Sequence, residues 1–118
     1  MRLLTVSALL AGALALPGPP AEAAARPSCR ADVCLWTGAD YTGEVFTWRV
    51  ADGNVHIGAE HADRVGSFVA DVEVCFVDTA DSEWSWTERR RAGEGDYSPN
   101  YYRRFGHRMD RLAPARHC

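Results

Sequence analysis

Short stretches in which apolar and polar residues alternate follow one another along most of the chain and predict β-strands. The clearest stretch is 45–50, where Phe46 and Trp48 fall on one face. The other expected strands are 33–36, 65–69, 72–77 and 84–86. Turn residues separate these stretches, and no segment of ten or more residues combines helical periodicity with caps at both ends. The pattern therefore predicts an all-β fold in the form of a sandwich.

The N-terminal segment has the pattern of a secretory signal peptide. Arg2 precedes an uncharged apolar run over 3–16, and these 14 residues fall short of the roughly 20 that span a bilayer. Small residues then offer cleavage sites after Ala23 or Ala25. The alternative is an amphipathic or buried N-terminal helix that stays part of the protein. We expect residues 1–25 to be removed and the protein to be secreted, without a membrane span.

An internal repeat divides the remaining chain, which we expect to form one domain over 26–118. Neither copy is large enough to close a core alone, so the two copies must pack face to face. The first motif is expected over about 29–70 and the second over about 71–118. The aligned segments are 33–40 with 74–81, 46–48 with 84–86 after a deletion of three, and 63–68 with 107–112.

Four cysteines follow the predicted cleavage site, and an even number in an exported chain indicates two disulfides. Three connectivities are possible. Cys29 and Cys34 are five residues apart around a turn and pair most cheaply with each other, which leaves Cys75 with Cys118. The chain has no C-x-x-C pair, so the sequence disfavours a zinc site.

Charge is divided unevenly along the chain, whose formal net charge is -3. Residues 31–88 hold 12 acidic residues and 2 Arg, whereas 89–118 hold 8 Arg and 3 acidic residues. The acidic balance disfavours nucleic acid as a partner. The basic part contains a segment punctuated by Gly and Pro with three tyrosines, and Tyr and Arg are enriched at binding hot spots. The candidate partner contacts are Tyr97, Tyr101, Tyr102, Arg103 and Arg104.

The same segment also has an interpretation without any partner. In it, the acidic and basic halves of the chain pair with each other inside the protein, and Tyr101 or Tyr102 lies in the core.

Catalytic motifs are not recognisable in the sequence. His56 and His61 have the wrong spacing for a zinc-peptidase helix, and Ser67 lacks a G-x-S-x-G context. We therefore expect a protein that is not an enzyme and that needs no cofactor or metal.

A spaced set of five residues resembles the Greek-key motif of the βγ-crystallins. Trp36 and Tyr41 are followed by Gly43 and Phe46, and Ser67 comes some twenty residues later. In such a motif the aromatic pair closes a folded hairpin, the glycine supplies a backbone angle that a Cβ would resist, and the serine hydrogen-bonds the hairpin backbone. The resemblance implies a βγ-crystallin-like Greek-key sandwich of two sequence-related motifs, braced by disulfides.

The leader, the C-x-x-x-x-C spacing and the segments 33–36 and 63–67 together resemble secreted actinobacterial proteins of the crystallin-like peptidase-inhibitor family. Its named members inhibit metalloproteinases. The resemblance implies a secreted protease as partner, bound one to one by a monomeric inhibitor. The alternatives are a killer-toxin-like antimicrobial module that acts on cell envelopes, and a weak calcium-binding structural domain. Ala62 and Gly66 replace oxygen-bearing residues of the microbial calcium pattern, so a tight calcium site is not expected.

Overall fold

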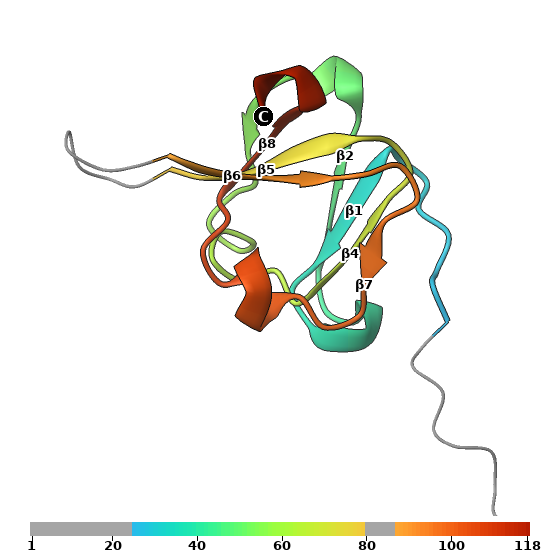
Figure 1. Cartoon of the computed structure of the whole chain (residues 1–118). Coiled ribbons are helices and arrows are strands. Elements are labelled where there is room, and N and C mark those ends of the chain that lie inside the picture. The colour runs from blue at the N-terminus through green and yellow to red at the C-terminus, as the bar shows by residue number, and fades with distance from the viewer. Residues whose placement is uncertain (1–24, 80–86) are drawn as a thin grey trace, which may run out of the picture.

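The computed structural model describes residues 25–79 and 87–118 (Figure 1). The predicted signal peptide up to residue 24 lies outside the described residues, and so does the predicted strand at 84–86. Within the described ranges, no helix is long and apolar enough to cross a membrane.

In the described part of the chain, eight strands form two four-stranded antiparallel sheets, in agreement with the all-β fold that the pattern predicts. The first sheet has the order β2-β1-β4-β7 and the second has the order β3-β8-β5-β6. The first comprises β1 (Val33–Trp36), β2 (Val45–Trp48), β4 (Ser67–Ala70) and β7 (Tyr97–Ser98). The second comprises β3 (Val55–His56), β5 (Val74–Asp78), β6 (Glu88–Ala92) and β8 (Arg111–Pro114). The short helices are η1 (Ala39–Tyr41), η2 (Val50–Asp52), η3 (Tyr102–Gly106) and η4 (Ala115–His117).

The two motifs exchange one strand each. The third strand of the first motif, β3, pairs with β8 of the second motif, and β7 of the second motif pairs with β4 of the first. Each sheet is therefore built from both halves of the chain, and the sheets cross in Figure 1 as two layers of a sandwich. This arrangement confirms the predicted all-β sandwich of two motifs.

Large side chains from both sheets fill the space between the layers. Leu35 and Trp48 from the first sheet and Phe76 and Leu112 from the second are at most 1% exposed. The ring of Phe68 meets that of Phe76 edge-on, with centroids 5.0 Å apart, and so joins the two layers. Burial of each such side chain contributes about 1.5–3 kcal/mol, which makes this core the main stabilising element.

Ser67 locks the folded hairpin of the first motif. Its Oγ donates a hydrogen bond to Gly38 O (2.7 Å) and accepts one from Tyr41 N (2.9 Å), although the residue is fully buried. The rings of Trp36 and Tyr41 meet edge-on at 5.3 Å. Gly43 has a φ of 84°, and a Cβ at this residue would collide with the side chain of Thr37.

The strand register corrects one part of the predicted repeat. Leu35 lies opposite Phe46, and its counterpart Phe76 lies opposite Arg90. The structural counterpart of Phe46 is therefore Arg90, so the second copy carries an insertion of three residues rather than a deletion. The aligned segments 63–68 and 107–112 are confirmed, because Phe68 pairs with Leu35 as Leu112 pairs with Phe76. The aromatic pattern gave the wrong match because β6 is an edge strand with little apolar surface.

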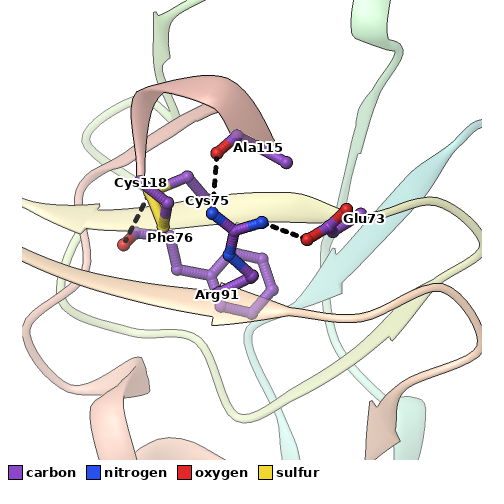
Figure 2. Close-up of a disulfide and its surroundings, with 6 residues drawn as sticks. All are labelled: Glu73, Cys75, Phe76, Arg91, Ala115 and Cys118. Atoms are coloured by element: carbon purple, nitrogen blue, oxygen red, sulfur yellow. Dashed lines mark hydrogen bonds and ion pairs between the residues drawn. A yellow bond between two sulfur atoms is a disulfide. The ribbon is translucent and has the colours of Figure 1, made fainter.

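Both disulfides join the cysteines that the spacing pairs. Cys29–Cys34 has a Cα–Cα distance of 5.8 Å and closes a turn before β1. Cys75–Cys118 has a Cα–Cα distance of 5.3 Å and ties the C-terminal helix η4 to the middle of β5. Figure 2 shows Arg91 beside this bridge, in an ion pair with Glu73 and donating to Ala115 O at 3.4 Å. The C-terminal segment is thus fixed against the face of the second sheet that points away from the main core.

Candidate partner-binding surface

The segment 93–106, which we call the strap, follows β6, contains β7 and η3, and is anchored to the first motif by main-chain hydrogen bonds. Gly95 N donates to Ala70 O and Tyr101 N donates to Gly66 O, both at 2.8 Å. Between these anchors, Pro99 O accepts a hydrogen bond from Asp40 N at 2.7 Å. The strap therefore lies across the first motif with its backbone held at several separate places, which limits its freedom.

A tight turn begins this segment. The Asp96 carboxylate accepts a hydrogen bond from Gly93 N at 2.6 Å, and Asp96 N donates to Gly93 O at 3.0 Å. Gly95 adopts a φ of 88°, which glycine tolerates better than any other residue. The two glycines that mark the segment as a loop in the sequence thus direct the chain from β6 back along β4.

Tyr101 packs against the core and is partly buried. Its ring lies 4.7 Å from that of Phe68 and 5.8 Å from that of Phe76, centroid to centroid. Burial raises the pKa of Tyr101 to about 12, against an opposing effect of the charges of Arg90 and Arg104. The phenol is consequently neutral at physiological pH. This placement agrees with the alternative in which Tyr101 or Tyr102 lies in the core, and because the ring is only partly buried, Tyr101 stays a candidate contact residue.

Tyr97 and Tyr102 are the exposed tyrosines, at 54% and 50%. Tyr97 ends the first sheet on β7, and the guanidinium of Arg26 lies 5.5 Å from its ring centroid. Tyr102 opens η3 and lies 5.8 Å from the ring of His107. Large exposed aromatic side chains on a fixed backbone are typical of binding surfaces.

A surface pocket of about 320 Å³ lies beside Tyr97, between β6, β7 and the start of η3. The predicted contact residues Tyr97, Tyr101 and Arg104 line it, whereas Tyr102 and Arg103 do not. Sequence reasoning missed the other lining residues, because they converge only through the pairing of β7 with β4. These residues are Phe68, Arg91, Ala92, Asp96 and Ser98.

The acidic and basic halves are only partly paired with each other. Among the described residues, three of four ion pairs join 31–88 to 89–118. These pairs are Arg90–Glu88 at 2.6 Å, Arg108–Glu88 at 2.9 Å and Arg91–Glu73. All are partly exposed, so each contributes roughly 0–1 kcal/mol. Arg103 and Arg104 form no ion pair within the described ranges, which leaves their charges available to a partner.

The three-dimensional structure also argues against the microbial calcium-binding pattern in the first motif. At Gly66, where the pattern has a hydroxyl residue, an added Cβ would lie 2.6 Å from Gly38 O and 2.5 Å from Gly38 C. A serine or threonine therefore cannot fit there without moving the hairpin. In the part of the chain that the structure describes, no group of three or more His, Cys, Asp or Glu side chains could hold a metal ion.

Comparison with known proteins gives both a family and a fold. The family model of "Peptidase inhibitor family I36" matches residues 21–79, which is half of the chain. A solved structure described by the words "Evolution of the eye lens beta-gamma-crystallin domain fold" superposes with a TM-score of 0.52 and 16% identity. The superposition covers 69% of this chain and 81% of that one, and at this identity it shows the fold alone.

Two curated relatives come from Dictyostelium discoideum. Spore germination protein 1 and spore germination protein 2 are each 29% identical to this chain over 84 residues. The match covers 70% of this chain and 62% of each relative, so the chain spans less than two thirds of their length.

Proposed function

The chain belongs to peptidase inhibitor family I36, and from this premise we propose that it is a secreted inhibitor of an extracellular metalloproteinase, bound one to one. Membership of an inhibitor family together with a crystallin-like fold identifies a binding protein rather than an enzyme. The two disulfides are consistent with an oxidising, extracellular compartment. The metalloproteinase class follows the named inhibitors that the sequence resembles.

One observation supports the position of the contact surface. The strap that carries Tyr97 and Arg104 is hydrogen-bonded to the first motif through its main chain, so little flexibility is lost when a protease binds. Tyr97 projects at the rim of a pocket, and Arg104 adds a positive charge on the same rim. An aromatic side chain beside a pocket is the arrangement in which a few residues supply most of the binding energy.

The test is a titration of the oxidised protein against a thermolysin-type metalloproteinase, a subtilisin and a trypsin. We expect the activity of the metalloproteinase to fall linearly and to vanish at one equivalent, with no change on addition of calcium beyond the enzyme's own requirement. If none of the three proteases is inhibited while the protein stays folded and uncleaved, the proposal is wrong.

A pair of variants locates the surface on the molecule. Tyr97 and Val45 lie on the opposite edge strands of the first sheet, β7 and β2, and are 54% and 49% exposed. Tyr97→Ser should raise the inhibition constant about thirtyfold, the effect of removing a hot spot of about 2 kcal/mol. Val45→Ser should leave it unchanged. An equal loss in both variants would place the contact elsewhere.

A further inference from the structure

A second pocket, of about 300 Å³, lies on the face of the second sheet that points away from the main core. Its floor is Val77 and Ala113, which form a small cluster with Cys75 apart from the main core. Its walls are polar or positively charged. The wall residues are Asn54, Thr79, Thr87, Arg89, Arg111 and His117.

The strand register places two guanidinium groups on either side of the floor. Val77 lies opposite Arg89 on β6 and opposite Arg111 on β8. Residues opposite one another share a face of the sheet, so both arginines leave the sheet on the same side as Val77. Their backbones are two strand spacings apart, about 10 Å, and long arginine side chains can reach a common ligand across that gap.

These two arginines differ from their neighbours in having no carboxylate partner among the residues that the structure describes. Arg90, Arg91 and Arg108 all form ion pairs, whereas within 25–79 and 87–118 neither Arg89 nor Arg111 does. Arg111 is oriented instead by a neutral group, because its Nε donates to Asn54 Oδ1 at 3.0 Å. Two like charges on one face are left without a counter-charge from the described chain.

The C-terminal disulfide supplies the third wall. It holds η4 against β5 and so places His117 at the pocket. The carboxylate next along the chain to Arg111 is that of Asp110, which accepts hydrogen bonds from Thr79 N at 3.0 and 3.1 Å and does not line the pocket. The described walls therefore offer hydrogen-bond donors and positive charge, and no carboxylate.

We propose that this pocket binds a dianionic oxyanion, a phosphate or sulfate group that is either a free ion or the terminal group of a small ester. Arginine forks match the oxygens of such groups, and the hydroxyls of Thr79 and Thr87 supply further donors. The pocket volume exceeds that of the ion alone, so the organic part of an ester also fits. The site shares no residue with the pocket beside Tyr97. It is thus a binding site in addition to the proposed protease contact.

Isothermal titration of the oxidised protein with inorganic phosphate, sulfate and glycerol 3-phosphate tests the site, with acetate as a monoanionic control. We expect saturable binding of the dianions, and binding of acetate at least tenfold weaker. Tighter binding of glycerol 3-phosphate than of inorganic phosphate identifies an ester as the ligand, and the reverse order identifies a free ion. No saturable binding of any dianion overturns the proposal.

Three charge-matched variants test where the anion binds. Arg89→Gln and Arg111→Gln should each weaken phosphate binding about tenfold or more, the effect of losing one charge-assisted hydrogen bond. Arg103→Gln removes the same charge from an exposed position outside the pocket and should change binding less than twofold. If all three variants weaken binding equally, the effect is one of overall charge and the site is refuted. Arg89→Gln decides the matter if Arg111→Gln fails to fold, because Arg89 is exposed on an edge strand.

Discussion

The two Greek-key motifs of this protein use equivalent positions for different purposes. In the first motif, Ser67 is buried and hydrogen-bonds the folded hairpin, and Phe46 packs against the core. In the second motif the register puts Arg111 and Arg90 at these positions. One copy therefore uses the positions for its own stability, whereas the other places charge at the surface. A duplicated motif can lose its internal lock when strand exchange lets the intact copy support both sheets.

The largest expected effect on stability comes from removing a disulfide, and it should differ between the two bridges. Removal of Cys75–Cys118 in the double serine variant should lower the free energy of unfolding by about 4 kcal/mol, because the bridge closes a long loop, and removal of Cys29–Cys34 should lower it by about 2 kcal/mol. Urea denaturation of both variants measures the difference. Equal losses would mean that native-state contacts, rather than loop length, set the effect of the bridges.

The next largest effect concerns Ser67, which stabilises the hairpin of the first motif, and Arg111, which occupies the equivalent position in the second. Ser67→Ala leaves two partly buried backbone groups of the hairpin, Tyr41 N and Gly38 O, without their partner and should cost about 2–3 kcal/mol. Arg111→Ala should cost less than about 1 kcal/mol, since Arg111 makes one exposed side-chain hydrogen bond. Urea denaturation gives both values. A cost for Arg111→Ala as large as that for Ser67→Ala would show that the second motif has a lock of its own.

The sequence could predict the first motif better than the second, for a physical reason. β2 alternates because one of its faces packs on the core, whereas β1 and β5 are nearly continuous apolar runs because both of their faces are buried. β6 carries three consecutive arginines at a sheet edge and gives no apolar signal. The repeat alignment failed at that strand and succeeded at 107–112, where Leu112 is buried.

The candidate site was accessible to sequence reasoning only in part. The local sequence was enough to select Tyr97 and Arg104, because Tyr and Arg residues in a segment punctuated by Gly and Pro can be recognised without knowing the fold. Phe68 and Asp96 reach the same pocket through the exchange of β7 into the first sheet, and no local pattern encodes that long-range pairing. Likewise, the sequence offered Tyr101 or Tyr102 for the core, and only the contacts of the Tyr101 ring with Phe68 and Phe76 decide between them.

A smaller effect concerns the tyrosines that the two motifs bury. The unfolded chain releases the Tyr101 proton near the ordinary pKa of about 10, whereas the folded protein holds it to about 12. The contribution of Tyr101 to stability is therefore complete below pH 10 and is lost as the pH rises from 10 to 12, by roughly 1–2 kcal/mol after solvent screening. Burial also raises the pKa of Tyr41.

Urea denaturation at pH 9 and pH 11 measures how much stability is lost at alkaline pH. Comparing the parent protein with Tyr101→Phe and Tyr41→Phe shows how much of this loss each tyrosine causes. Tyr101→Phe should remove more of the alkaline loss than Tyr41→Phe, because its ring lies deeper among core aromatics. If neither variant flattens the pH dependence, groups other than these tyrosines are responsible for it.

The smallest expected effect concerns the position at which Arg90 replaces the aromatic of the first motif. Its guanidinium lies 5.5 Å from the ring centroid of Phe105 and pairs with Glu88, while Arg108 approaches the same ring at 5.4 Å and the same carboxylate. Arg90→Gln removes one of two cations that share both partners, so the cost should be only about 0.5–1 kcal/mol. Phe46→Ala in the first motif should cost clearly more, since its ring packs against the hydrophobic core, and thermal unfolding in low and high salt compares the two. The Arg90 effect should shrink in high salt and the Phe46 effect should not. A salt-independent loss at Arg90 would mean that its aliphatic stem, rather than its charge, replaces the missing aromatic.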